Sequence, residues 1–329
     1  MTTRRRIFAS TMRAADSEPS EAPLCGGIEA GGTKFVCAIG SDPLHIHARA
    51  RFETDQSGHP ERTLQACHDW FRSEQQRLGV TISALGIGSF GPLDLARQTI
   101  TTTPKPGWRN FPLGRELERL LGLPIAFDTD VNAAVLAEHR WGAGREVSSL
   151  VYVTIGTGIG GGALVAGELL HGALHPEMGH MPLQRDPADT FAGVCPYHGA
   201  CWEGLCSGPA LRARWGLPAE ELAADHPAWP VQARYVAQAL YTVACVLSPR
   251  RFVLGGSVSR AGRLGSARFL ALVHAHFRAI ANGYLALPEL AEIERYIVSP
   301  GLGEDSGVLG CLALAERALL GERASLRRH

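Results

Sequence analysis

A group of cysteines and histidines in the middle of the chain carries the most specific chemical signal. The group consists of His180, Cys195, His198 and Cys201. Its last three members follow a C-x2-H-x2-C spacing, and two sulfur and two nitrogen ligands are what a closed tetrahedral zinc site takes. Because four protein ligands leave no open position for water, we predict a structural rather than a catalytic zinc ion. His175 and Cys206 are alternative fourth ligands.

Three glycine-containing turns are suited to binding a nucleoside triphosphate. They are Gly31-Gly32-Thr33-Lys34, Gly156-Thr157-Gly158 and Gly255-Gly256. Glycines let backbone amides approach an anion closely, and a hydroxyl and an ammonium group add donors and positive charge. Each turn taken singly is equally typical of an ordinary turn, and the spacing is neither that of a Walker P-loop nor that of a dinucleotide fingerprint. The first two turns, facing one cleft, would grip both ends of a triphosphate, and a flat adenosine would lie against the third.

Asp130 is the candidate catalytic base. It follows a predicted strand and stands close to Asn132 at the start of a predicted helix. Phosphoryl transfer needs a carboxylate that orients the acceptor hydroxyl and accepts its proton. The alternative is that Asp130 caps the helix, which is the commonest role of Asp at such a position. The presence of the glycine turns favours the catalytic role.

Two glutamates near the cysteine and histidine group are candidates for binding a polyol. A carboxylate such as that of Glu177 or Glu203 accepts hydrogen bonds from two neighbouring hydroxyls, and a loop braced by a metal would hold it in place. Without these metal-ligand neighbours, both residues would be interpreted as solvated surface glutamates.

The elements that position these residues follow from hydrophobic patterns. Residues 26–40 and 150–166 each predict a hairpin with a glycine turn between two β-rich runs. This repeat indicates a duplicated architecture in which each copy opens one domain and the cleft lies between the two. Further predicted elements are strands at 84–90, 124–128 and 251–254, and helices at 61–77, 131–141, 230–247 and 305–320. The last helix, rich in small apolar residues, is expected to pack back on the first domain.

Composition narrows the class of protein. The chain has 329 residues, 45% of them hydrophobic, with 32 basic and 32 acidic side chains. This length favours two domains, and the balanced charge indicates no nucleic-acid partner. No apolar run is long enough to span a bilayer, so we expect no membrane partner. We predict that residues 1–23 form a disordered tail, where Asp16, Glu18 and Glu21 argue against a transit peptide.

The cysteines do not follow the pattern of a disulfide scaffold. Five of them lie in apolar strand-like or helix-like contexts and are expected in the core: Cys25, Cys37, Cys67, Cys245 and Cys311. Eight cysteines at irregular spacing in a chain of this length favour a reducing compartment. We therefore expect a cytoplasmic protein.

The order of the motifs along the chain resembles that of the ROK sugar kinases. The matching segments are 29–34, 90–94, 104–108, 130–134, 156–161, 175–180 and 195–208. The resemblance covers nearly the whole chain from Cys25 onward. Three segments are similar to the bacterial fructokinase branch of that family, namely Lys105-Pro-Gly-Trp108, Cys195-Pro-Tyr-His198 and Ser299-Pro-Gly-Leu-Gly303.

The resemblance implies an α/β protein with the two-domain actin-like ATPase (ribonuclease H-like) fold. Residues 24–128, completed by 305–329, would form the first domain, and 129–304 the larger domain with the zinc-binding sugar loop. ATP and Mg²⁺ would bind between them, and Asp130 falls where the family has the base that activates the 6-hydroxyl of a hexose such as D-fructose. The residues implied to bind the sugar are Lys105, Asn132, Glu177, His180 and Glu203, with His180 also at the zinc-ligand position. Family members are commonly homodimers.

Departures from the family pattern leave the sugar open. Lys105 stands where glucokinase-like relatives tend to have Asn, Thr129 where many relatives have Asn, and Trp202 where Leu is usual. Mannose or glucose is therefore the alternative acceptor. A sugar-sensing regulator of the same family would carry a helix-turn-helix domain ahead of the sugar domain, for which the segment before the first hairpin is too short. A zinc-stabilised sugar-binding protein without turnover is the third alternative.

Overall fold

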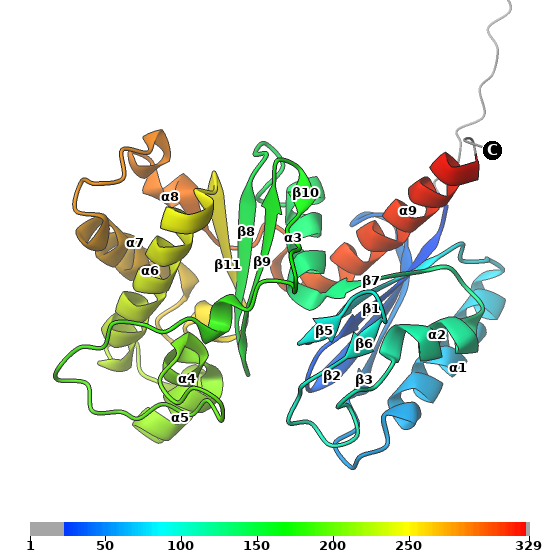
Figure 1. Ribbon diagram of the computed structural model, residues 1–329, viewed down its shortest axis with the longest axis horizontal. Helices are drawn as coiled ribbons and strands as arrows, with labels where there is room; N and C mark the ends of the chain where they lie inside the picture. The colour runs from blue at the N-terminus through cyan, green and yellow to red at the C-terminus, as the bar shows by residue number, and fades with distance from the viewer. Residues whose placement is uncertain (1–22, 327–329) are drawn as a thin grey trace, which may run out of the picture.

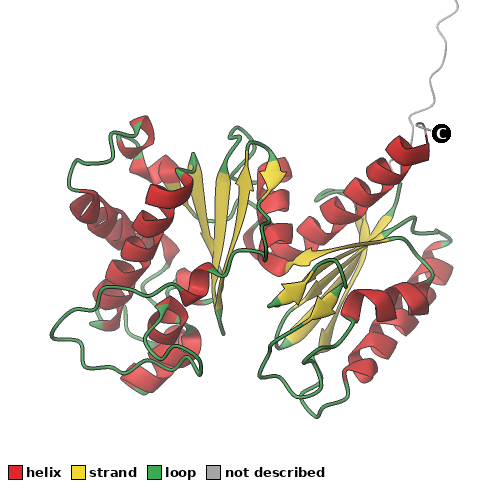
Figure 2. Cartoon of the chain, viewed as in Figure 1, coloured by secondary structure: helices red, strands yellow, loops and turns green. Residues whose placement is uncertain are grey.

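Two five-stranded sheets stand side by side and carry helices on their faces (Figure 1, Figure 2). The structure is a computed structural model, and it describes residues 23–326. We call the part built on the first sheet lobe 1 and the part built on the second sheet lobe 2. The tail predicted at residues 1–23 lies outside the described residues except for its last position.

Lobe 1 is built on a sheet with the strand order β3-β2-β1-β4-β7. Its strands are β1 (Cys25–Ala30), β2 (Lys34–Gly40), β3 (Ile46–Glu53), β4 (Leu85–Ser89) and β7 (Ile125–Thr129), and its helices are α1 (Pro60–Leu78) and α2 (Leu113–Leu121). A small antiparallel ribbon consists of β5 (Leu93–Asp94) and β6 (Thr99–Ile100). Phe35, Phe71 and Trp108 are buried in one core that joins the sheet, the helices and the ribbon.

Lobe 2 is built on a sheet with the strand order β10-β9-β8-β11-β12. Its strands are β8 (Leu150–Ile155), β9 (Ile159–Val165), β10 (Glu168–Leu169), β11 (Arg251–Gly255) and β12 (Ile297–Val298). The remaining helices are α3 (Asp130–Trp141), α4 (Trp202–Cys206), α5 (Gly208–Trp215), α6 (Ala228–Leu247), α7 (Ser266–Ala281), α8 (Ile293–Tyr296) and α9 (Ser306–Leu326). Short 3-10 turns are η1 (Met178–His180), η2 (Ala219–Glu221), η3 (Val258–Arg260), η4 (Pro288–Leu290) and η5 (Gly303–Asp305).

The two sheets repeat one topology. In each, an antiparallel hairpin, β1–β2 or β8–β9, is extended by two parallel strands on one side and by one antiparallel strand on the other. Both predicted hairpins are therefore confirmed. The exact division into domains, at residues 24–128 and 129–304, stays a prediction.

The sequence of β8 is a nearly continuous apolar run because both faces of this strand are covered. Leu150 and Tyr152 point to the face that packs on α3, and Val151 and Val153 point to the opposite core with α6 and α7. Alternate side chains of a strand point to opposite faces, so a sheet with helices on both faces needs apolar residues at every position. The β-branched residues of this run fit such a pleated, buried surface.

Helix α9 crosses from lobe 2 back onto lobe 1, where it packs on β1 and β4 and against α3 (Figure 1). This packing confirms the expected return of the last helix. Close approach depends on glycine, because a Cβ at Gly86 would overlap the carbonyl oxygen of Cys311 and one at Gly310 would overlap that of Ala133. The small residues at this crossing let the backbones of α3, α9 and the sheet of lobe 1 pack in direct contact.

A buried carboxylate fixes the start of α9. Glu138 of α3 is fully buried, and its Oε1 accepts hydrogen bonds from the Ser306 hydroxyl at 2.6 Å and the Leu302 amide at 3.1 Å. Its Oε2 accepts from the amides of Ala143 at 2.7 Å and Gly301 at 2.9 Å. We call this arrangement the α3–α9 junction. Donors of the protein thus take the place of the water molecules that would otherwise form hydrogen bonds to this carboxylate.

Two expectations from the sequence concern the burial of five cysteines and the presence of membrane-spanning helices. Cys25, Cys37, Cys67 and Cys311 are buried as expected, but Cys245 is exposed on α6, so its prediction as a core residue is wrong. It lies near the end of α6, on a face of the helix that faces away from the sheet core. Within residues 23–326, no helix is both long and apolar enough to cross a membrane.

Candidate active site between the two sheets

Asp130 lies at the junction of β7 and α3. The N-cap of α3 is Thr129, whose hydroxyl accepts the Asn132 amide at 3.0 Å. Asp130 therefore does not hold the capping position that was its alternative role, and its Oδ1 accepts a hydrogen bond from the neighbouring Val131 amide at 2.9 Å. The pKa of Asp130 is raised to about 7, mainly by burial and then by the negative charges of Glu29 and Glu177.

Two glutamates from different lobes contribute to this electrostatic setting. Glu29 lies on β1 directly before the first glycine turn, and its carboxylate packs against Gly307 in the first turn of α9. Burial raises the pKa of Glu29, while Lys34 lowers it. The pKa of Glu177 is raised to about 7, mainly by burial and then by the charge of Glu203. Carboxyl groups that raise one another's pKa in this way typically mark functional sites.

Glu203 and Lys105 complete the group. Glu203 lies in the first turn of α4, and its Oε2 accepts a hydrogen bond from the Ile159 amide of the second hairpin at 2.9 Å. Lys105 comes from lobe 1 and places Nζ 4.7 Å from the ring centroid of Phe90. Burial lowers the pKa of Lys105, whereas the charges of Glu203 and Asp130 raise it. The ammonium group thus lies within the field of acidic groups on both sides of the site.

We call Glu29, Lys105, Asp130, Glu177 and Glu203 the interlobe site. Sequence analysis named four of them and missed Glu29. The signal that identifies Glu29 is its place at the first position of the first glycine motif, which is a charged residue at the end of an otherwise apolar strand.

The first glycine turn joins β1 to β2. The Gly31 amide donates to the Lys34 carbonyl at 2.9 Å, and the Thr54 hydroxyl donates to the Gly31 carbonyl at 2.8 Å. The side chains of Thr33 and Lys34 are exposed. The turn is held through its carbonyl groups, and its hydroxyl and ammonium groups point into solvent, as a phosphate-binding turn requires.

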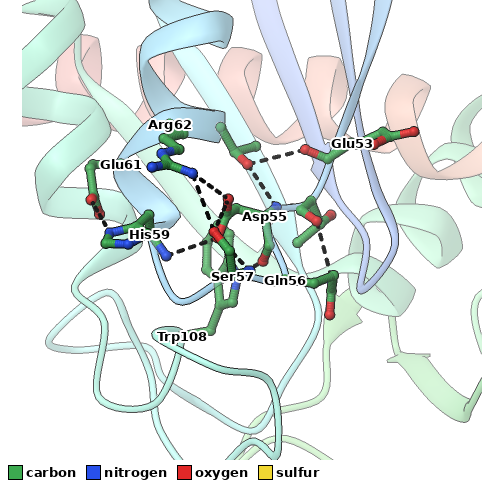
Figure 3. A network of polar contacts seen from close by, with 10 residues as sticks. Glu53, Asp55, Gln56, Ser57, His59, Glu61, Arg62 and Trp108 are labelled. Carbon is green, nitrogen blue, oxygen red and sulfur yellow. Dashed lines mark hydrogen bonds and ion pairs between the residues drawn. The ribbon is translucent and has the colours of Figure 1, made fainter.

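The loop between β3 and α1 contacts both this turn and the segment that carries Lys105. Figure 3 shows the polar contacts within the loop and Trp108 of that segment. Asp55 folds the loop by accepting backbone amides on its own carboxylate. The Gln56 amide group donates to the Gly32 carbonyl at 3.2 Å, and the buried Trp108 indole donates to the Asp55 carbonyl at 2.8 Å. Lys105 also packs directly against Gly32, where a Cβ would lie 2.5 Å from Cε of the lysine. These contacts couple the glycine turn to Lys105.

The second and third turns lie at neighbouring strand ends of lobe 2. The Gly156 amide donates to the Gly158 carbonyl at 2.9 Å, and Thr157 between them is exposed. A side chain at Gly158 would meet Oε2 of Glu203, which places this turn at the interlobe site. Gly255 ends β11, the parallel neighbour of β8, and Gly256 follows it with a positive φ.

The four predicted zinc ligands converge on one point. Their ligand atoms all lie within 4.8 Å of one another. The Cys195 sulfur lies 3.7 Å from Nδ1 of both His180 and His198, and the Cys201 sulfur lies 3.6 Å from Nδ1 of His180. Zinc bonds of about 2.1 Å to nitrogen and 2.3 Å to sulfur place tetrahedral ligand atoms roughly 3.6 Å apart. These three distances match that spacing, so the four residues form a ligand set of the type and size that zinc takes.

The alternative fourth ligands lie elsewhere. Nε2 of His175 accepts the Leu93 amide at 2.9 Å, and Cys206 is buried in the core of lobe 2. Neither belongs to the group of converging ligand atoms that we identify among the described residues. The structure therefore brings together the set with His180.

Asn132, which was predicted to bind the sugar, is not part of the interlobe site. Its side chain is fully buried, and its Nδ2 donates to Oδ1 of Asp128 at 2.8 Å. The amide of this side chain is thus used inside the protein, at the base of the turn that carries Asp130.

Comparisons with known proteins identify the family of the chain. The model of the ROK family matches residues 25–318. The chain is 41% identical to a fructokinase of Zymomonas mobilis and 38% identical to one of Pediococcus pentosaceus, over 89% and 90% of its own length and 96% and 99% of theirs. Among solved structures it is similar to a ROK hexokinase from Thermus thermophilus, with a TM-score of 0.74, 28% identity, and coverage of 91% of this chain and 99% of that one. The paired sheets are those of the actin-like ATPase fold, and the chain belongs to the ROK family.

Proposed function

We propose that this protein is an ATP-dependent fructokinase that transfers a phosphoryl group to the 6-hydroxyl of D-fructose. The observation that carries the proposal is Asp130, a carboxylate at a helix start that does not cap the helix and whose pKa is raised to about 7 by burial and by Glu29 and Glu177. A base works best when its pKa lies near the operating pH. The similarity to fructokinases over most of the chain supports the choice of substrate.

In this mechanism Asp130 orients the hydroxyl of the sugar and accepts its proton as the phosphoryl group moves. The exposed Thr33, Lys34 and Thr157 would hold the phosphates from both lobes, and Gly255 and Gly256 would let adenosine lie against backbone. Mg²⁺ bound with ATP would offset the charge that develops during transfer. We assign Glu29 to this cation, because a buried carboxylate whose pKa is raised fits a site that a cation completes.

The sugar would be held by groups from both lobes. Glu177 and Oε1 of Glu203 offer acceptors for hydroxyl groups, since Oε2 of Glu203 is bonded to the Ile159 amide. Lys105 offers a donor from lobe 1. His180 would bind zinc through Nδ1 and a sugar hydroxyl through Nε2, so the metal would fix the orientation of a substrate ligand. Asn132, whose amide is bonded inside the protein, is left out of this set.

Several further properties belong to the same proposal. Zinc would be structural, bound by His180, Cys195, His198 and Cys201. The resemblance to the family supports a homodimer with hexose and ATP as its small-molecule partners, and the irregular spacing of the cysteines supports a cytoplasmic location. The resemblance also supports a first domain of residues 24–128 completed by the last helix, and a second of residues 129–304.

A sugar panel tests the proposal. ADP release, measured with fructose, mannose and glucose in turn, should require a hexose and should give the highest kcat/KM with fructose. A preference for glucose or mannose would keep the mechanism and change the substrate. Absence of hexose-dependent ADP release, in protein that still binds sugar, would leave a sugar-binding protein without turnover.

A further inference from the structure

The segment between β10 and η1 makes two contacts with lobe 1 through histidines four residues apart. We call this segment, residues 170–176, the histidine strap. The Leu170 amide donates to the Ala163 carbonyl at 2.9 Å, which anchors the strap to β9 of lobe 2. From there, His171 reaches Asp128 on β7 and His175 reaches Leu93 on β5. Both targets belong to lobe 1.

We propose that His171 and His175 are positioning residues that hold the base Asp130 and the sugar ligand Glu177 in register across the two lobes. The inference rests on the proposed function, since it assigns these histidines to the same site. Neither histidine belongs to the interlobe site or to the four zinc ligands, so each acts through the residue that it contacts.

His171 acts on the turn that carries Asp130. Its Nε2 lies 2.8 Å from Oδ2 of Asp128, whose side chain is only 6% exposed. Nδ2 of Asn132 also lies 3.2 Å from Nε2 of His171, but it donates to Oδ1 of Asp128 at the shorter distance of 2.8 Å. Because a carboxylate only accepts hydrogen bonds, we assign the proton to Nε2 of His171, which donates it to Asp128. Oδ1 of Asp128 accepts the Thr129 amide at 2.7 Å and the Asn132 side-chain amide at 2.8 Å. Asp128 therefore grips the chain on both sides of Asp130.

The need for His171 follows from the position of Asp128. A buried carboxylate is stable only where donors satisfy it, and His171 is the donor that comes from the other lobe. Without it, Oδ2 of Asp128 would lose its partner and the carboxylate would turn toward water. The amides of Thr129 and Asn132 would then be held less firmly, and the direction of the Asp130 side chain between them would vary.

His175 acts on Glu177 in the opposite tautomer. Its Nε2 accepts the Leu93 amide at 2.9 Å, so the proton of this ring lies on Nδ1. Nδ1 faces Oε1 of Glu177 at 3.6 Å and the Pro176 carbonyl at 3.5 Å. The side chain of His175 is only 3% exposed. A single ring thus joins a backbone amide of lobe 1 to the segment that presents Glu177.

Because the two rings carry their protons on different nitrogens, variants can be chosen that either keep or remove each hydrogen bond. A glutamine can donate from its side-chain nitrogen where His171 donates, and can accept on its side-chain oxygen where His175 accepts. His171→Gln and His175→Gln should therefore keep the contacts that His171→Ala and His175→Ala remove. His47→Ala, at an exposed position of β3, is the matched control.

Amide hydrogen exchange tests the contacts without using turnover. His171→Ala should speed exchange at residues 129–132 by about tenfold, and His175→Ala should do so at Leu93, whereas the Gln variants and His47→Ala stay close to the wild-type rate. Equal exchange in the Ala variants and the wild type would overturn the proposal, whatever the catalytic activity. If an Ala variant does not fold, the shorter His171→Asn or His175→Asn takes its place.

Kinetics by ADP release then separate positioning from a general loss of stability. His175→Ala should raise the KM for fructose by about tenfold with the KM for ATP within about twofold, and His171→Ala should lower kcat by a similar factor. The Gln variants should recover most of each loss. Equal changes in kcat and both KM values, with no recovery in the Gln variants, would reduce the strap to a packing role. Absence of turnover in the wild type would refute the proposed function but not the role of the histidine strap, because the exchange experiment would still test the contacts of His171 and His175.

Discussion

The two ends of helix α3 carry carboxylates in contrasting surroundings. Glu138, near its end, accepts four hydrogen bonds from Ala143, Gly301, Leu302 and Ser306. Asp130, at its start, accepts the adjacent Val131 amide and lies near two further carboxylates, and its pKa is raised to about 7. A carboxylate surrounded by donors stabilises the fold, whereas a half-buried one that lies among like charges is kept available for a ligand. The same helix therefore serves structure at one end and chemistry at the other.

The largest effect on folding is expected at the α3–α9 junction. Glu138→Ala would leave several buried donors without a partner, and we expect it to lower the free energy of unfolding by about 4 kcal/mol. Urea unfolding followed by circular dichroism measures the change. Glu118→Ala, at an exposed position of α2, is the control and should change stability by less than about 0.5 kcal/mol. A loss at Glu138 no larger than that of the control would refute the structural role.

The four predicted zinc ligands extend the comparison. Polar groups at Glu138 are satisfied by hydrogen bonds, whereas those of the zinc ligands would be satisfied by an ion. We expect one equivalent of zinc per chain by metal analysis, lost in Cys201→Ser, with the KM for fructose raised by about tenfold or more since His180 loses its fixed orientation.

Two other cysteines serve as controls for this prediction. Cys245→Ser, at an exposed position, and Cys206→Ser, outside the converging group, should both keep the metal. Retention of zinc in Cys201→Ser would contradict the ligand assignment, and loss of zinc in Cys206→Ser would show that Cys206 is a ligand.

The pH dependence of kcat/KM sharpens the contrast at Asp130. A base must be deprotonated to accept a proton, and burial with Glu29 and Glu177 raises the pKa of Asp130 to about 7. We therefore expect kcat/KM to rise about tenfold per pH unit below pH 7 and to level off above it. Glu177→Gln removes one of the charges that raise this pKa, so the whole profile should shift to lower pH. A profile that is flat between about pH 5.5 and 8 would contradict the assignment.

Local patterns could be predicted from the sequence, and distant partnerships could not. The hairpins at 26–40 and 150–166 and the helix at 61–77 appear close to their predicted bounds, because their periodicity lies within one element. Helix α7 (Ser266–Ala281) was not predicted, although its buried Phe269, Val273 and Phe277 recur four residues apart, which is the spacing of one helix face.

Among the functional residues, too, those in local motifs could be predicted and those that depend on distant contacts could not. Asp130 and the zinc ligands stand in short motifs whose spacing is visible in the chain. The role of Glu138 depends on Gly301 and Ser306, more than 160 residues away, and nothing in the local sequence around Glu138 indicates that partnership. Glu29 was missed because its burial against the start of α9 is likewise a contact between distant segments.

The most direct test of the account is to measure turnover and stability together in Asp130→Asn. A carboxyl group whose folded pKa lies above its unfolded value near 3.8 loses stability as pH rises from about 4 to 7, so removing its charge should stabilise the protein at pH 8. We predict a gain of about 1 kcal/mol, allowing for solvent screening of this half-buried group, and a loss of turnover of about a thousandfold. An Asp130→Asn variant that keeps near-normal turnover, or that loses stability as Glu138→Ala does, would contradict the account.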